Sequence, residues 1–328
     1  MEQLSDLKKH INSITEIKQM TRAMQLISAV KMRRARTQLE KSIPFFALCA
    51  ETMVELRDAG ATFNNTFFQL RPKKPGETWK IGYFILTGDQ GLAGAYNMNV
   101  LTTTEKHIRS KMIDNVRKGL NTTAKLYVAG SIGKERLIRE GFDVVEDFQY
   151  PINEPTYYRA RDISDFIHDL YETETLDLVY FIYTRIESAI SMKPVVTRIL
   201  PVNPDVLETI VPQEYRAHRG LEAGSSVEYA PSSDDVIQYL INTYLNGMVY
   251  GALTEAFASE QTARMTAMDN ATENADEMLG KLTLKNNQAR QARITSELSE
   301  IVGGAEVLTA QTAKKKTEGE TTEWQKDM

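Results

Sequence analysis

The sequence has few of the residues that form disulfides or bind metals. Its single cysteine, Cys49, excludes an internal disulfide and a cysteine-based zinc cluster. The four histidines are scattered without metal-ligand spacing. No apolar run reaches the roughly 18 residues of a membrane span, and the first residues fit neither a secretory signal nor an import presequence. We therefore expect a chain that is cytosolic or bound to the cytosolic side of a larger structure, without metal or cofactor.

The chain also lacks a strong overall charge. Its formal net charge of −5 at pH 7 gives no reason to expect a nucleic-acid partner. Positive charge is nevertheless concentrated near the N-terminus, in Lys8, Lys9, Lys18, Arg22, Lys31, Arg33, Arg34, Arg36 and Lys41. We expect the densest part of this basic segment, from Lys31 to Arg36, to meet an acidic protein surface.

Proline is missing from both ends, since all ten prolines lie between Pro44 and Pro231. From Met1 to Ile43 apolar residues recur every three or four positions, which predicts one amphipathic helix. Three successive steps of three between Ile11 and Met20 would overwind a coiled coil locally. Pro44 can kink the helix without ending it. The apolar positions are Leu4, Leu7, Ile11, Ile14, Ile17, Met20, Met24 and Ile27.

The same period predicts a second, longer helix from Asp234 to Leu308. At 1.5 Å per residue it would be roughly 110 Å long, more than one domain core can cover. Each terminal helix alone would expose an apolar stripe. We therefore expect an antiparallel coiled coil in which the longer helix projects beyond the pair. The last apolar positions have heptad spacing and are Ile294, Leu298, Ile301, Ala305 and Leu308.

Between the helices, β-branched or aromatic runs alternate with helical patterns, which predicts a Rossmann-like α/β domain with a mainly parallel sheet. The last two strands are joined without a helix and should therefore be antiparallel. The expected strands are Ile81–Thr87, Ala124–Ala129, Asp143–Tyr150, Leu178–Thr184 and Val195–Pro201. The expected helices are Asn97–Lys118, Ile132–Glu140 and Arg161–Thr173.

These patterns divide the chain into six segments. They are a coiled-coil helix at 1–60, a linker at 61–78, the α/β domain at 79–211, a loop at 212–233, a coiled-coil helix at 234–308 and a disordered tail at 309–328.

Two stretches could carry chemistry. Gly88–Gly94 follows the first strand, where phosphate-binding loops lie. It lacks the Gly-Lys-Ser/Thr ending of a P-loop, and Asp89 would repel a phosphate, so a tight turn explains it better. The acidic group Glu273, Asp276 and Glu277 could hold a metal ion, but a solvated helix face is the better interpretation. The residues by themselves indicate a mechanical or interaction protein.

Sequence motifs in the two terminal helices are more specific for one protein family than these two stretches are. Ile14 to Met24, continuing to Arg33, resembles the N-terminal helix of the gamma subunits of F-type ATP synthases. Asn287 to Ala305 resembles the C-terminal signature of that family, and Ser259 to Asn274 fits the approach to it. Asp89 to Gly94 is similar to the family's Asp-Lys-Gly-Leu-Cys-Gly turn, with Gln90 in place of Lys and Ala93 in place of Cys. The resemblance covers the chain up to about Leu308.

The resemblance implies a central rotor subunit without a catalytic site of its own. The terminal helices would form an axle inside a hexamer of alternating alpha and beta subunits, and the α/β domain would lie near the epsilon subunit and the membrane ring of c subunits. Each face of the turning axle would favour one beta conformation. The expected setting is the cytoplasmic side of a bacterial plasma membrane. The implied hexamer contacts are Arg22, Met24, Lys31, Arg33, Arg36, Arg290, Gln291 and Thr295.

Two rival functions stay open on the residues alone. A nucleotide-dependent enzyme built on the α/β domain would bind ATP or NAD in isolation. A static coiled-coil tether would depend only on its apolar seam, which we expect to include Ile294, Leu298 and Ile301 packed on the partner helix.

Overall fold

The structure is a computed structural model that describes residues 4–58, 66–148, 150, 153, 155–187, 191–203 and 233–323. Two compact units are present. One is formed by Met1–Ala23 with Asp269–Met328, and the other by Met24–Met268. Helices α1 (Leu4–Asp58) and α6 (Ser233–Glu323) contribute to both units. Pro44 lies inside α1 without ending it, as predicted.

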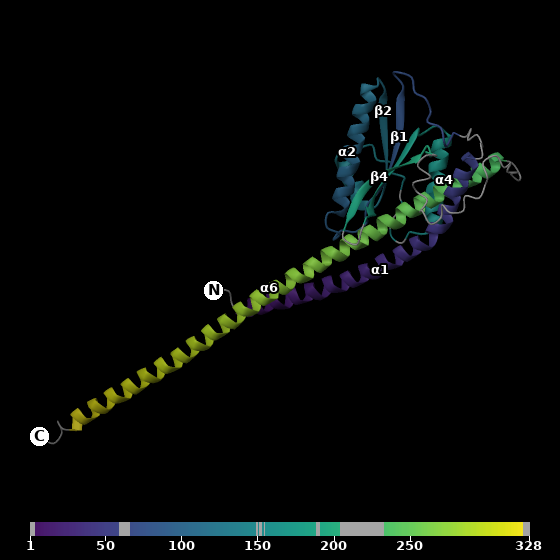
Figure 1. Ribbon diagram of the computed structural model, residues 1–328. Coiled ribbons are helices and arrows are strands. Elements are labelled where there is room, and N and C mark those ends of the chain that lie inside the picture. Colours follow the sequence, from purple (N-terminus) through teal and green to yellow (C-terminus); the bar gives the residue numbers. More distant parts are fainter. Residues whose placement is uncertain are drawn as a thin grey trace. The chain divides into compact units, whose positions relative to one another are not determined.

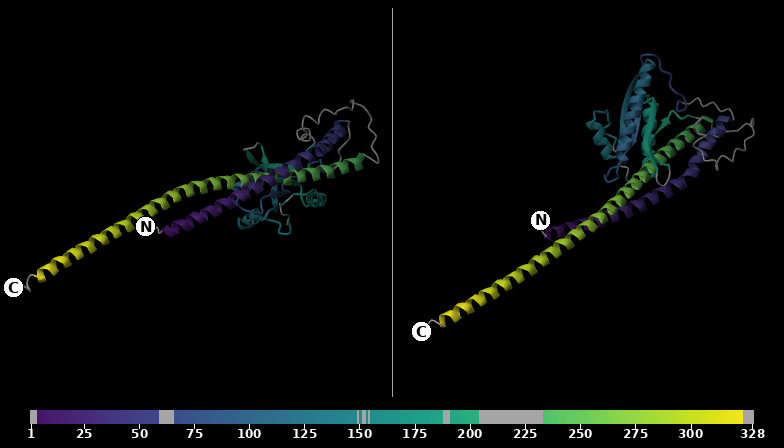
Figure 2. Two further views of the ribbon diagram at one scale, coloured as in Figure 1. Left: turned by 90° about the horizontal axis from the view of Figure 1, so that it is seen from below. Right: turned by 60° about the vertical axis from the view of Figure 1, so that its left-hand side comes forward.

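The two long helices run antiparallel and side by side within each unit (Figures 1 and 2). In the first unit Thr21 contacts Thr272 and Lys18 contacts Asp276, so numbers fall along α1 as they rise along α6. In the second unit the ring of Phe46 packs on Gly247, where a Cβ atom would lie 2.2 Å from a ring carbon. The predicted antiparallel helix pair is confirmed.

The second unit contains a four-stranded sheet in the order β2-β1-β3-β4. Strand β1 (Thr78–Leu86) pairs in parallel with β2 (Asn121–Ala129) and β3 (Leu178–Ile186). Strand β4 (Met192–Leu200) pairs antiparallel with β3. The prediction of a mainly parallel sheet that ends in an antiparallel pair is confirmed.

Three further helices lie close to their predicted positions: α2 (Tyr96–Arg117), α3 (Ser131–Arg139) and α4 (Tyr157–Glu172). The strand predicted at Asp143–Tyr150 is wrong. Among its described residues the segment forms only an isolated bridge, between Leu126 and Val144. The charged pair Glu146 and Asp147 forms a turn that interrupts the β pattern.

The two faces of the sheet bury different sets of aromatic residues, because alternate residues of a strand point to opposite faces. On one face Phe84 stacks on Tyr127 and Phe181, and this core includes residues of α1, α4 and α6. On the other face Tyr83 stacks on Tyr180, and this core includes residues of α2 and α3 (Figure 1).

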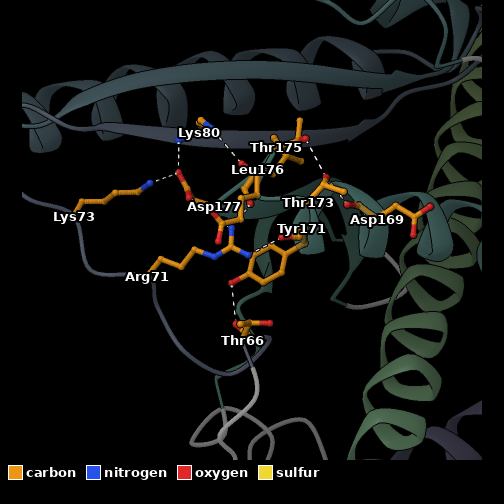
Figure 3. A network of polar contacts seen from close by, with 11 residues as sticks. Thr66, Arg71, Lys73, Lys80, Asp169, Tyr171, Thr173, Thr175, Leu176 and Asp177 are labelled. Carbon is orange, nitrogen blue, oxygen red and sulfur yellow. Dashed lines mark hydrogen bonds and ion pairs between the residues drawn. The ribbon is translucent and has the colours of Figure 1, made fainter.

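The described part of the predicted linker, residues 66–77, is bound tightly to the sheet (Figure 3). Asp177 is 2% exposed, accepts a hydrogen bond from the backbone of Lys80 and lies 2.9 Å from the ammonium group of Lys73. Arg71 donates to the carbonyl oxygens of Leu176 and Tyr171. These contacts make residues 66–77 a fixed part of the fold.

Helix α6 continues to Glu323, so Thr309–Glu323, which we expected to be disordered, is helical. The reason is local, because the alanine, lysine and glutamate residues of this stretch favour helices. The last five residues and positions 212–232 of the loop predicted at 212–233 lie outside the described residues, and Ser233 is the first residue of α6.

The packing of His107 on α2 leads to a prediction about pH. Its ring lies edge-on to Tyr83 and Tyr180, and its Nδ1 atom is buried without a hydrogen-bond partner. Burial, with a smaller effect of Lys111, lowers the pKa of His107 from 6.5 to about 4. Between these pH values the unfolded chain binds a proton that the folded chain does not.

The free energy of unfolding should therefore fall by about 1–2 kcal/mol as the pH decreases from 6.5 to 4, after allowance for the partial exposure of the ring. Urea unfolding of the chain and of a His107→Phe variant, at several pH values, measures the difference in slope. An NMR titration of His107 with a pKa near 6.5 would contradict the prediction.

Candidate functional surfaces on the two long helices

The seam between α1 and α6 in the first unit follows a regular heptad. One set of buried and half-buried positions on α1 advances in alternating steps of four and three, and so does one set on α6. They are Leu7, Ile11, Ile14, Lys18 and Thr21 on α1, and Thr272, Ala275, Leu279, Leu282, Asn286 and Ala289 on α6. The expected local overwinding is therefore wrong, because the seam keeps its phase after Ile14 and accepts polar residues there.

This phase leaves apolar residues of α1 on the outside. In the first unit Ile17 and Met20 are 45% and 62% exposed, while Thr21 faces α6. In the second unit Ile27 and Val30 are 56% and 68% exposed. Between them Ser28 is only 2% exposed. Polar residues thus face inward and large apolar residues outward, which marks this side of α1 as a surface for a protein partner.

An apolar groove lies on this side of α1 in the second unit. It has a volume of about 470 Å³. Ile27 and Val30 line it together with Pro155 and Phe257, and Lys31 and Arg34 form its basic side. Apolar walls with cationic neighbours suit a partner segment that carries both apolar and acidic residues.

The basic residues predicted to meet a partner are accessible. Lys31, Arg33 and Arg36 are exposed, as is the neighbouring Arg34. None of the four lies within ion-pair distance of a carboxylate of a described residue. Met24 is half-buried. No ion pair within the described part of the chain therefore neutralises this segment, although burial raises the pKa of the Glu260 carboxylate and the charge of Lys31 partly opposes this shift.

In the first unit, α6 is exposed all round beyond its last half-buried position, Ala289. Every residue from Arg290 to Gln311 is exposed, which includes the predicted contacts Gln291 and Thr295. Arg22 on α1 is exposed as well. The Thr295 hydroxyl donates to the carbonyl oxygen of Gln291 in its own helix.

The expectation that Ile294, Leu298 and Ile301 pack on the partner helix is wrong. They are 48%, 57% and 68% exposed. The described part of α1 begins at Leu4 and buries α6 only as far as Ala289. Apolar residues therefore remain on the same exposed segment as the predicted polar contacts.

The loop Gly88–Gly94 is a turn that caps a helix. The Asp89 carboxylate accepts a hydrogen bond from the backbone N–H of Ser131 at 3.1 Å, and the Ser131 hydroxyl donates to the Asp89 carbonyl oxygen at 3.1 Å. Ser131 is the first residue of α3. The carboxylate thus caps the N-terminus of α3, which gives the loop a structural role and favours the tight-turn interpretation.

A buried ion pair on α6 holds the same loop. Glu260 and Arg264 are 3% and 5% exposed and lie 2.5 Å apart. Arg264 also donates to the carbonyl oxygens of Gln90 and Gly91. A Cβ atom at Gly88 would lie 2.6 Å from the Glu260 carboxylate, so glycine is required there. Burial raises the pKa of Glu260, and Arg264 opposes this shift.

Sequence reasoning missed this ion pair as a structural element. The available signal was a glutamate and an arginine four residues apart among small residues, a spacing that places them on one helix face. The contact also explains why Gln90 is acceptable, because Arg264 binds only its backbone carbonyl.

The acidic group on α6 lies on a solvated face, as expected, since Glu273, Asp276 and Glu277 are all exposed. Asp276 also forms an ion pair with Lys18 of α1. Among the described residues, His168, Asp169 and Glu172 form the one group with metal-ligand geometry. His168 Nε2 already lies 3.1 Å from Gln238, and both acids are exposed.

None of the helices among the described residues has the length and apolar character needed to span a membrane.

Comparisons with known proteins confirm the resemblance. The sequence profile of the family described as ATP synthase matches residues 3–308. The ATP synthase gamma chain of Ruminiclostridium cellulolyticum is 42% identical over 305 residues, with 93% of this chain and 98% of that protein covered. The gamma chain of Acetivibrio thermocellus is 38% identical, with 94% of this chain and all of that protein covered.

A more distant relative is the gamma chain of Acetobacterium woodii, described as sodium ion specific. It is 32% identical, with 94% of this chain and 99% of that protein covered. The fold matches a chain of the Euglena gracilis mitochondrial ATP synthase with a TM-score of 0.57 and 14% identity, over 94% of this chain and 95% of that one. The chain belongs to the family of ATP synthase gamma chains.

Proposed function

We propose that this chain is the central-stalk rotor subunit of an F-type ATP synthase that translocates protons or sodium ions. It would couple rotation of a membrane c-ring to successive conformations of catalytic beta subunits. Its partners would be the alpha and beta subunits, the epsilon subunit and the c-ring. The chain itself carries no catalytic site in this proposal.

The observation that carries the proposal is the reversed polarity of the helix pair. Lys18, Thr21 and Ser28 lie on the seam side of α1, while Ile17, Met20, Ile27 and Val30 are exposed. A pair of helices that worked alone in water would reverse this arrangement. A surrounding hexamer of partner subunits would cover the exposed apolar side of α1. The part of α6 beyond Ala289 would contact the same hexamer.

The faces of the helices also differ from one another, as coupling by rotation requires. The α1 side carries the apolar groove beside the exposed cations Lys31 and Arg34. The end of α6 carries Arg290, Gln291 and Thr295 together with exposed apolar residues. Each beta subunit would meet a different face, and a ligand or partner shifts a conformational equilibrium only through such differential contact.

The rival enzyme function has little support, because the Gly88–Gly94 loop lacks the Gly-Lys-Ser/Thr ending of a P-loop and its Asp89 carboxylate caps α3. The rival tether does not account for the exposed basic cluster at Lys31–Arg36. Within the proposed complex the chain would be peripheral to the membrane, and we place it on the cytoplasmic side of a bacterial plasma membrane.

The deciding experiment is purification of the tagged chain after co-expression with alpha and beta subunits. We expect all three in a fixed ratio, and ATP-driven rotation of a bead attached to the α/β domain of this chain. Failure to recover alpha and beta subunits would overturn the proposal, as would calorimetric heat from ATP or NAD binding to the isolated chain.

A truncation tests the end of α6. Residues beyond Leu308 lie outside the part matched by the family profile, and those described are helical. We expect a chain that ends at Leu308 to assemble with the hexamer and support normal ATP turnover. A chain that ends at Ala289 is the control and should assemble poorly. Loss of hexamer binding in the Leu308 truncation would show that the tail beyond Leu308 contributes to the contact with the hexamer.

A further inference from the structure

A histidine and two acids near the end of α4 bring three metal-binding atoms together. The Nδ1 atom of His168 lies 3.8 Å from the Asp169 carboxylate and 3.7 Å from the Glu172 carboxylate. The three ligand atoms all lie within 4.8 Å of one another. Residues four apart share one helix face, and Asp169 flanks the other two by about 100° of rotation. Helix geometry therefore assembles these three residues, the α4 cluster.

The distances in the α4 cluster are too long for hydrogen bonds but suit a shared cation. N–H···O bonds measure about 2.7–3.2 Å. Ligand atoms at tetrahedral angles around a zinc ion, each about 2.0–2.2 Å from it, are about 3.4 Å apart. The separations of 3.8 and 3.7 Å from Nδ1 are close to that spacing. The side chains of Asp169 and Glu172 are 80% and 68% exposed, so both can turn toward an ion.

The histidine of the cluster is held in position from its other side. Its ring stacks on Phe67 with the ring centroids 4.7 Å apart, and its Nε2 atom lies 3.1 Å from the amide nitrogen of Gln238 on α6. The His168 side chain is only 19% exposed. Metal-bound histidines have such a partner on the second ring nitrogen, which fixes the direction of the first. The Nδ1 atom is therefore aimed at the carboxylates by the fold itself.

The amide of Gln238 suits either tautomer of His168. When the amide nitrogen donates to Nε2, the proton of the neutral ring is on Nδ1. A half-turn of the amide places its oxygen there instead, so that Nε2–H donates and Nδ1 offers its lone pair to a metal ion. The tautomer that binds a metal therefore keeps the contact between α4 and α6.

The ligand types indicate which ions the cluster would bind. An imidazole nitrogen with carboxylate oxygens suits Zn²⁺ and similar transition metals, whereas Mg²⁺ and Ca²⁺ prefer oxygen ligands alone. An acidic surface without the histidine would not make this distinction. The Asp169 side chain extends away from the buried network around Asp177 (Figure 3). Water can therefore reach the cluster and complete the coordination of an ion.

We propose that His168, Asp169 and Glu172 form a site for a divalent transition-metal ion, for which Zn²⁺ is the best fit. The site concerns the chain itself and does not depend on the proposed function. A bound ion would fix the ring that links α4 to Phe67 and to Gln238, and would stabilise this part of the fold. Sequence reasoning missed the site because it compared only the spacing of histidines and cysteines, whereas two of these three ligands are acids.

Calorimetric titration of the full-length chain, purified without a histidine tag, tests the proposal. We expect one saturable Zn²⁺ site per chain that persists in excess Mg²⁺, and a thermal midpoint that rises with Zn²⁺. The His168→Phe variant keeps an aromatic ring against Phe67 and should lose the site. Asp169→Asn/Glu172→Gln should weaken binding at least tenfold. Gln238→Leu, which removes only the partner of Nε2, should weaken it by about 10–100-fold.

Matched controls separate this site from the general acidity of α4 and from the other histidines. Asp162 and Asp165 are exposed acids of the same helix, so Asp162→Asn/Asp165→Asn removes the same charge as the double variant of the cluster. His10 is an exposed histidine of α1. The Asp162→Asn/Asp165→Asn and His10→Gln variants should both bind Zn²⁺ as the unaltered chain does.

Absence of Zn²⁺ binding to the unaltered chain would overturn the proposal. Binding that excess Mg²⁺ displaces would overturn it as well, and so would binding that is unchanged in His168→Phe. Circular dichroism checks that each variant is folded. Should His168→Phe fail to fold, the exposed pair Asp169→Asn/Glu172→Gln decides, because unchanged affinity in that variant would contradict the proposed ligands.

Discussion

Replacing Lys31, Arg33, Arg34 and Arg36 together by glutamate is expected to abolish assembly with the catalytic hexamer or to slow ATP turnover severely. The four cations are exposed and have no carboxylate of a described residue within ion-pair distance. An exposed ion pair contributes only about 0–1 kcal/mol, so single alanine variants should be mild. Reversing all four charges replaces several attractions by repulsions within two helical turns, and these effects accumulate.

The control for net charge is the same reversal at four exposed cations of the α2 region, Lys106, Arg109, Arg117 and Lys118. Its net charge changes equally, but binding to alpha and beta subunits should persist. Assembly is measured by co-purification and turnover by ATP hydrolysis, each at low and high salt. Normal turnover and coupling in the α1 variant would refute the acidic partner surface.

The second large effect is expected at the end of α6. Replacing Arg290, Gln291 and Thr295 by alanine should weaken coupling and lower ATP synthesis, while the chain stays folded and the complex assembles. Gln291 and Thr295 are four residues apart on one helix face, and Arg290 flanks them. All three are exposed, so their loss removes nothing from the core.

Each hydrogen bond to a beta subunit would contribute about 0.5–1.5 kcal/mol, and the bond from charged Arg290 somewhat more. Because such bonds form only when this face meets one beta subunit, one rotational state should lose a few kcal/mol relative to the others. ATP synthesis and ATP-driven ion pumping in membranes measure this loss. The matched control replaces Thr102, Lys106 and Arg109 on α2 by alanine.

The two possible outcomes of the triple substitution distinguish a rotor function from a static tether function. A tether depends on its seam, and these three residues lie outside it, so unchanged pumping and synthesis would mean that this face meets only water. Reduced coupling with intact assembly would show that the face contributes to one rotational state, as a rotor requires.

The helices and strands could be predicted mainly because they depend on short-range regularities. The proline-free ends give long helices, and β-branched runs give β1, β2, β3 and β4 within a few residues of their expected bounds. The strand expected at Asp143–Tyr150 failed where a charged turn broke the pattern. The prediction of a disordered tail beyond Leu308 was wrong because low hydrophobicity was interpreted as disorder. The helix propensity of these residues is enough to extend α6.

The candidate surfaces could be predicted only in part. The motif at Arg290, Gln291 and Thr295 and the basic run at Lys31–Arg36 could be identified along the chain, since both are local. The ion pair of Glu260 with Arg264 could not be assigned to the loop at Gly88–Gly94, because its meaning depends on a partner more than 160 residues away.

The sequence by itself therefore determined that this chain has two long terminal helices around an α/β domain, and that its ends carry the signatures of gamma chains. Hydrophobic periodicity and local motifs suffice for that. Only the tertiary structure decided which side of each helix is the seam. Ile17 and Met20 fit the apolar period as well as Ile11 and Ile14 do, yet they lie outside. A heptad seam must keep the same phase on both helices. Which residues of one helix are buried therefore depends also on the sequence of the other helix.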